Sequence, residues 1–112
     1  MFLNRLEKQE KIAFLELAHY VARSDNDFSL SQKDIINNYC IEMQIENIEF
    51  NVNKFDIYNT LGKITNKKSQ KIVLLEIMAL IYSDNFLHEE ERKVLEKILE
   101  EFNLNYHLAT VY

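Results

Sequence analysis

Hydrophobic residues recur at intervals of three and four along most of this chain, which is the spacing of one face of an α-helix. The first stripe predicts a helix from near Leu3 to Arg23 or Ser24. Its members are Phe14, Leu17, Ala18, Val21 and Ala22. A second helix is predicted after Ser29, because Ser29 and Gln32 have the spacing of a capping box. Its buried face would consist of Ile35, Ile36, Tyr39, Cys40 and Met43.

The middle of the chain is more polar and predicts a connector, a short helix and a hinge. Residues 44–53 mix polar and isolated apolar groups, so we expect a connector that is held to the core by Ile45, Ile48 and Phe50. A shorter third helix follows. Its apolar residues are Phe55, Tyr58, Leu61 and Ile64. The polar stretch 63–70 is the predicted hinge between two halves of the chain.

Two strongly patterned helices are predicted in the second half. Residues 72–82 are hydrophobic on every side apart from Glu76, which is typical of a central buried helix. A fifth helix is expected from about His88 to Phe102, with a charged outer face and three glutamates near its start. Residues 105–112 are predicted to form one more short helix that packs Leu108 and Val111.

The two halves resemble each other when Ser24 is aligned with Ser83. Ser24-Asp25-Asn26 then falls on Ser83-Asp84-Asn85, and the apolar residues from 28 to 45 coincide with those from 87 to 104. Because the match needs no gap, we expect two helix-loop-helix units, at about 12–45 and 72–104. The chain has one glycine and no proline, so it lacks the residues of tight β-turns. Residues 1–112 are therefore predicted to form an all-α, single-domain bundle of five to seven helices.

Composition narrows the class of protein and of partner. The formal net charge of −5 opposes binding to nucleic acid and makes a basic partner surface electrostatically easier. Cys40 is the only cysteine, so no internal disulfide can form and a reducing compartment is expected. Charged residues interrupt the start, and no later segment has the length of a membrane span. We expect a soluble, cytoplasmic protein without direct membrane insertion.

Each unit consists of an apolar helix, a Ser-Asp-Asn corner, a hydrophobic residue, a cap and a second helix. This arrangement resembles the TerB (tellurite resistance) family over roughly residues 12–104. In the second unit Asp84, Leu87 and Glu91 stand at the family's Asp, hydrophobic and Glu positions, and Glu76 stands at its buried-helix Glu. The first unit departs from the pattern, because Gln32 replaces the glutamate, and Asn26 and Asn85 replace the turn glycines of both units.

The resemblance implies an all-helical, non-enzymatic binding domain of the stress response that acts through protein contacts. It also implies a divalent cation, Ca²⁺ or Mg²⁺, at the acidic interhelical loops. The residues carried over as its ligands are Asp25, Asp84, Glu91, Glu76 and Glu16. An EF-hand is rejected, since a loop beginning at Asp25 would place Leu30 and Ile36 where that motif needs glycine and glutamate.

Structural interpretations of the same residues remain open beside the functional ones. Asp25 and Asp84 have the residue type that hydrogen-bonds turn backbone, and Glu91 has the spacing of a capping partner. Glu76 requires a partner or a cleft, because it interrupts an apolar helix. His19, three residues after Glu16, lacks the spacing of a zinc site.

Two functional hypotheses follow. The first is a TerB-like module that binds a protein partner, with or without the cation. The alternative is a small acidic adaptor or inhibitor whose glutamate-rich fifth helix covers a basic partner surface without metal. An enzyme is not expected, because no residues supply a nucleophile, a base and a stabilising group at suitable spacing. The sequence leaves the partner and the oligomeric state open.

Overall fold

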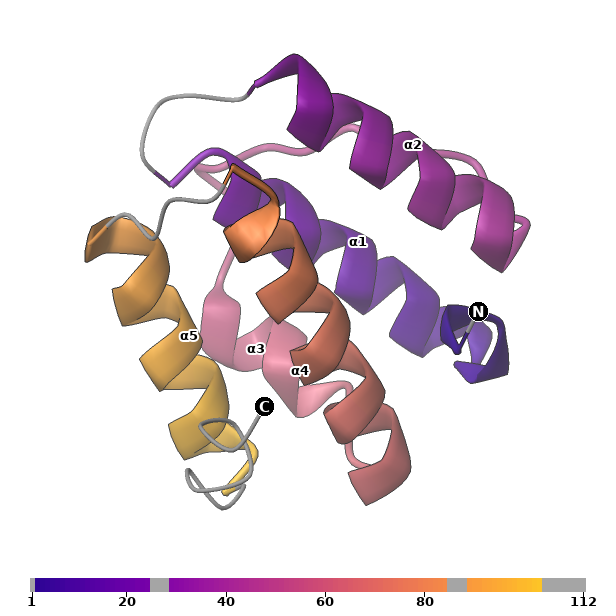
Figure 1. Ribbon diagram of the computed structural model, residues 1–112. Helices are drawn as coiled ribbons and strands as arrows, with labels where there is room; N and C mark the ends of the chain where they lie inside the picture. The colour runs from indigo at the N-terminus through magenta and orange to yellow at the C-terminus, as the bar shows by residue number, and fades with distance from the viewer. Residues whose placement is uncertain (1, 25–28, 85–88, 104–112) are drawn as a thin grey trace.

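The hydrophobic stripes fold into helices in the computed structural model, which describes residues 2–24, 29–84 and 89–103 (Figure 1). The α-helices are α1 (Lys8–Ala22), α2 (Leu30–Met43), α3 (Ile57–Gly62), α4 (Lys67–Ile81) and α5 (Glu89–Glu101). Two 3₁₀ helices, η1 (Leu3–Arg5) and η2 (Tyr82–Asp84), complete the regular structure. No β-strand occurs within these ranges. The predicted all-α bundle is confirmed.

The two helix-loop-helix units are visible in the helix boundaries. The shift that aligns Ser24 with Ser83 also brings both ends of α1 onto those of α4, and the start of α2 onto that of α5. The hydrogen bonds at the ends of the first helices repeat too. Ser24 Oγ donates to the Val21 carbonyl at 2.8 Å, and Ser83 Oγ donates to the Leu80 carbonyl at 2.7 Å. The same short sequence pattern therefore ends both helices in the same way.

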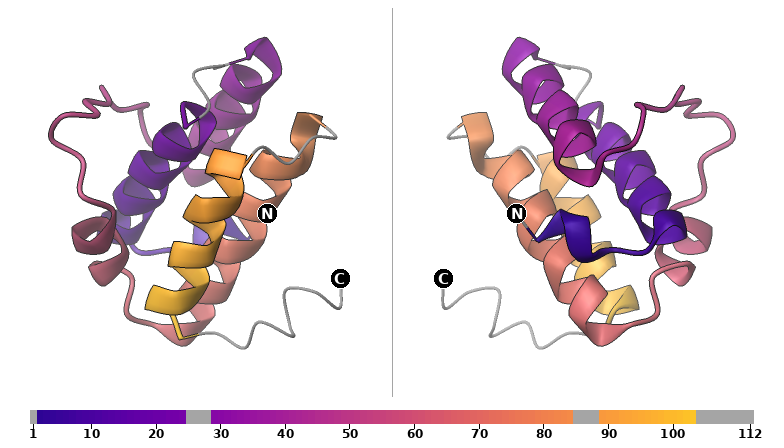
Figure 2. Two further views of the ribbon diagram at one scale, coloured as in Figure 1. Left: turned by 90° about the vertical axis from the view of Figure 1, so that its left-hand side faces the viewer. Right: turned by 90° about the vertical axis from the view of Figure 1, so that its right-hand side faces the viewer.

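Helix α1 lies at the centre of the bundle. It packs against α2, α3 and α4, whereas α5 packs on α3 and α4 (Figures 1 and 2). The predicted α1 stripe is fully buried. Phe14 meets Tyr39 of α2 edge to face, with ring centroids 5.0 Å apart. Burial, with a contribution from Glu76, raises the pKa of Tyr39, so its hydroxyl stays protonated and donates to the Glu76 carbonyl at 2.9 Å.

The predicted second helix is confirmed, and the predicted start of the first helix is wrong. Ser29 Oγ accepts from the Gln32 amide, and the Gln32 side chain accepts from the Ser29 amide, so the capping box is present. Near the N-terminus, η1 ends before an extended backbone at Leu6 and Glu7. Glu7 forms its own capping box with Glu10, which starts α1 at Lys8 rather than near Leu3.

The third helix and the hinge also differ from prediction, because two polar caps decide where helices start. Asp56 accepts from the amides that follow it, so α3 begins at Ile57 and leaves Tyr58 53% exposed. Asn66 caps α4 at Lys67, so half of the predicted hinge is helical. Gln70 is buried there and donates to the Ile64 carbonyl at 2.8 Å.

Helix α4 is buried on one side only. Val73, Ile77, Leu80 and Ile81 lie in the core, but the prediction of a central helix at 72–82 is wrong, because α1 takes the central position and one side of α4 is exposed. Leu75, by contrast, is 56% exposed, because α1 and α5 cover only part of the helix circumference. No described helix combines the length and apolarity that a membrane crossing requires. The short helix predicted at 105–112 lies outside the described residues.

Candidate functional site

The described members of the predicted cation site lie on different helices. Asp25 falls outside the described residues, and Asp84 ends η2 with an undescribed side chain. Glu16 belongs to α1, Glu76 to α4 and Glu91 to α5. Within 2–24, 29–84 and 89–103, no three His, Cys, Asp or Glu residues form a group that could hold a metal ion. The cation site at the interhelical corners therefore stays a prediction.

The three described glutamates have separate surroundings. Glu16 lies 3.9 Å from the Lys63 ammonium, in a partly exposed ion pair. Glu91 is fully buried in the first turn of α5, where a carboxylate is favoured by the positive end of the helix dipole. His88, the residue that the capping spacing of Glu91 points to, lies outside the described residues. Glu76 is half-buried and lines a groove beside η1.

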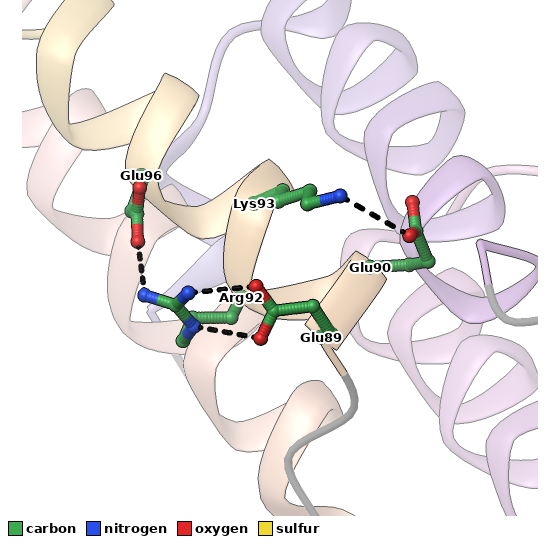
Figure 3. A network of polar contacts seen from close by, with 5 residues as sticks. All are labelled: Glu89, Glu90, Arg92, Lys93 and Glu96. Carbon is green, nitrogen blue, oxygen red and sulfur yellow. Dashed lines mark hydrogen bonds and ion pairs between the residues drawn. The ribbon is translucent and has the colours of Figure 1, made fainter.

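Three exposed glutamates of α5 form ion pairs within the helix (Figure 3). Arg92 bonds Glu89 at 2.7 Å and Glu96 at 2.6 Å, and Lys93 reaches Glu90 at 3.5 Å. The hydrogen bond from Arg92 lowers the pKa of Glu89. Such exposed pairs contribute little to stability, but they offset the negative charge that a basic partner would meet.

The largest described cavity lies elsewhere, between α1, α2 and the connecting segment 44–56. Its volume is about 960 Å³, and it is open to solvent. Three cations line it, and Glu49 is the one acid among its lining residues. The cations are Arg23 at the C-terminal cap of α1, Lys33 of α2 and Lys54 of the connecting segment. Side-chain amides add further donors and acceptors. They come from Asn37, Asn47 and Asn51.

Segment 44–56 is anchored at both ends and carries the cavity wall. At its start Gln44 adopts a left-handed conformation that ends α2, and the Ile45 amide donates to the Cys40 carbonyl at 3.1 Å. Ile45 and Ile48 pack against the core, as predicted. At its far end Phe55 stacks on Tyr20 of α1, with ring centroids 4.5 Å apart. A loop of this length, irregular but held in place, is typical of a binding element.

His19 joins α1 to this segment. Its Nε2 lies 2.8 Å from Asn47 Oδ1, which also accepts from the Ile48 amide. Because that oxygen is an acceptor, the network assigns the imidazole proton to Nε2 and leaves Nδ1 to accept from Arg23. Burial lowers the pKa of His19, the Asn47 hydrogen bond opposes this, and the Arg23 charge lowers it further. A neutral imidazole is the form that fits.

Phe50 makes most of the aromatic contacts between segment 44–56 and the residues around the cavity. Its ring stacks on His19 with centroids 5.8 Å apart and lies under the Arg23 guanidinium at 5.4 Å. It also meets Phe55 at 5.4 Å. A second cavity of about 220 Å³ opens beside it, where Arg23 is joined by Lys93 and Lys97 of α5. Phe50 therefore lines two neighbouring cavities that contain cations from four parts of the sequence, together with the acids Glu49 and Glu90.

Sequence reasoning identified Phe50 only as an anchor and assigned no role to His19. The cations that line the largest described cavity are separated by ten or more residues along the chain, so they form no local sequence motif. The signal that could have found this region is its length without regular structure, together with its asparagines and Phe50. The lysines of the predicted hinge formed a denser cluster in sequence, yet they do not line this cavity.

Acidification is expected to destabilise the protein through His19. The folded-state pKa lies below the ordinary value of 6.5, so in the range below pH 6.5 the unfolded chain binds more protons. The contribution of neutral His19 to the free energy of unfolding is therefore present above pH 6.5 and is lost as the pH falls through the folded-state pKa. Urea unfolding at about pH 7.5 and about pH 5.5 measures the decrease. His19→Gln should show a smaller decrease than the natural chain, and equal decreases would contradict the assignment.

Comparison of the chain with protein-family models, curated proteins and solved structures found no match in any of the three. The resemblance to the TerB family therefore rests on the quoted residues alone.

Proposed function

We propose that this chain is a non-enzymatic binding module that acts through protein contacts and holds an acidic segment of a partner protein in the cavity beside Phe50. The observation that carries this proposal is the charge of the cavity. In a chain with a formal charge of −5, three cations and one acid line the largest described hollow. The resemblance to TerB-like binding domains agrees with a non-catalytic role.

The chemistry of the lining favours carboxylates. A guanidinium and an ammonium form charge-assisted hydrogen bonds with carboxylate oxygens, and asparagine amides can bond a peptide backbone beside them. Arg23 is placed by its contacts with His19 and Phe50, so part of its conformational freedom is already lost before a ligand binds. The open shape suits a peptide that lies across the surface, whereas small-molecule sites are usually more enclosed.

The alternative adaptor would use the glutamates of α5 against a basic partner. The intrahelical pairs of Arg92 and Lys93 offset part of that acidic field, and this supports our choice of the cavity over the outer face of α5. The divalent cation is not part of this proposal, because the described carboxylates form no group around a common point.

Fluorescence anisotropy with a labelled hexaglutamate peptide tests the proposal, with hexaglutamine as the uncharged control. Lys54→Gln should weaken binding about two- to fivefold, which is the contribution of a partly exposed ion pair. The double variant Lys33→Gln and Lys54→Gln should weaken binding about tenfold or more, and added salt should weaken binding to the natural chain.

Lys8→Gln is the matched control. Lys8 is exposed at the start of α1, about 22 Å along the helix from Arg23, and should leave the affinity unchanged. Equal binding of hexaglutamine, or equal losses for Lys8→Gln and Lys54→Gln, would place recognition outside this cavity.

A further inference from the structure

Helix α4 carries a second apolar stripe that faces solvent. Ile72, Leu75 and Ala79 of α4 and Tyr82, which caps its end, are spaced by three, four and three residues, so they share one side of the helix. Leu75 and Tyr82 are 56% and 46% exposed, and Ala79 is exposed as well. In Figure 1, α4 lies in the foreground with α1 behind it and α5 at its side. Helices that are apolar all round are normally covered on every side, so this face lacks a cover among the described residues.

At the start of α4 this stripe widens into a groove with η1. Figure 2 shows η1 beside α4, and the groove between them has a volume of about 410 Å³. Its apolar surface comes from Phe2, which is 48% exposed, and from Ile72 and Leu75. The groove and the stripe together form a continuous apolar track along α4, about 15 Å long between residues 72 and 82. We refer to Phe2, Ile72, Leu75, Ala79 and Tyr82 as the α4 track.

The charges beside the α4 track are mostly positive. Arg5, Lys68 and Lys71 line the groove, and Glu76 is the only acid among its lining residues. Arg5 also lies over the Phe2 ring, 5.3 Å from its centroid. A second copy of this chain would bring the same cations and another net charge of −5 to the contact. An acidic partner would instead place carboxylates opposite these cations.

We infer that the α4 track is a docking surface for an amphipathic helix of a partner protein, with leucine-like residues on one face and acidic residues beside them. Apolar residues at three- and four-residue spacing on α4 match the spacing on such a helix, so side chains of the two helices can interdigitate. This surface goes beyond the proposed function, because it is separate from the cavity beside Phe50 and uses other residues.

A designed helical peptide provides the probe. It carries leucine at four positions spaced by three, four and three residues, with glutamates beside them. Fluorescence anisotropy should detect its binding below about 1 mM. Leu75→Gln should weaken binding about tenfold, because a leucine that becomes buried in the complex is replaced by a polar residue. Lys68→Gln combined with Lys71→Gln should weaken binding about threefold to tenfold.

Leu30→Gln is the matched control, since Leu30 is a 73% exposed leucine at the start of α2 and does not line the groove. It should leave the affinity unchanged. Circular dichroism should show the same helical signal for both leucine variants, because both residues are exposed. The cavity is tested separately, since hexaglutamate has no apolar side chains and Lys54→Gln should not affect the designed peptide.

Any one of five results would overturn the inference. The first is that the peptide fails to bind. The second is that a version with the same residues in scrambled order binds equally well. The third is that Leu75→Gln and Leu30→Gln change the affinity for the peptide equally. The fourth is a dimer in sedimentation experiments that Leu75→Gln dissociates, which would assign the α4 track to a second copy. The fifth is binding that appears only after residues 104–112 are removed, which would assign the α4 track to the chain's own C-terminal segment.

Discussion

Phe14→Ala is expected to destabilise the protein by about 3–5 kcal/mol, the range measured when a buried phenylalanine is truncated. Phe14 is completely buried on α1, the helix that packs against three others. Its ring also meets Tyr39 of α2, so the substitution removes an aromatic pair as well as apolar volume. Because domains are stable by only about 5–15 kcal/mol, we expect a large part of the total stability to be lost.

Urea unfolding followed by circular dichroism measures this loss. Phe2→Ala is the matched control, because Phe2 is 48% exposed and its ring lies under the Arg5 guanidinium at the surface. We expect Phe2→Ala to change the free energy of unfolding by less than about 1 kcal/mol. A loss below about 1 kcal/mol for Phe14→Ala would contradict the central position of α1 in the core.

Phe50→Ala is expected to weaken hexaglutamate binding about tenfold or more while leaving the helices intact. The ring contacts His19, Phe55 and Arg23, and each aromatic pair or cation–π contact contributes roughly 0.5–1.5 kcal/mol. Removing all three contacts leaves Arg23 without its ring and loosens segment 44–56 near residue 50, while the Asn47 and Phe55 contacts with α1 remain. Without these contacts, Arg23 and segment 44–56 must be ordered when the peptide binds, and an ordering cost of about 1.4 kcal/mol corresponds to a tenfold loss of affinity.

Tyr58→Ala is the control for this prediction. Tyr58 is an aromatic residue on α3 that is 53% exposed and does not line the cavity. It should leave both the helical signal and the peptide affinity unchanged. If Phe50→Ala kept full affinity, the aromatic wall would not place the cations, and the proposed recognition through this cavity would fail.

The fold was largely predictable because helix information is local. The stripe from Phe14 to Ala22 predicted a buried face, and all of its members are buried. The Ser29 and Gln32 spacing predicted the start of α2, and both cap hydrogen bonds are present. Predictions were wrong where an asparagine or aspartate side chain capped a helix within a polar stretch, as Asn66 does for α4. In the sequence, an asparagine or aspartate within a polar stretch looks the same whether it lies in a loop or caps a helix.

The candidate site was much less predictable. The five predicted cation ligands were carried over from the resemblance to the TerB family, and the described ones form no group that could hold a metal ion. The cavity depends on His19, Phe50 and three scattered cations, none of which forms a motif. The solvent-facing stripe of α4 was likewise hidden, because an apolar residue such as Leu75 has the same appearance in sequence whether it is buried or exposed.

The sequence by itself determined the helices, the doubling of the helix-loop-helix unit and the residues of the core, because burial and hydrogen bonding repeat with the period of the helix. Only the tertiary structure decided which charged residues become neighbours and which side of α4 is left uncovered. Both depend on contacts between segments that are distant in the chain, and the period of a single helix carries no information about them.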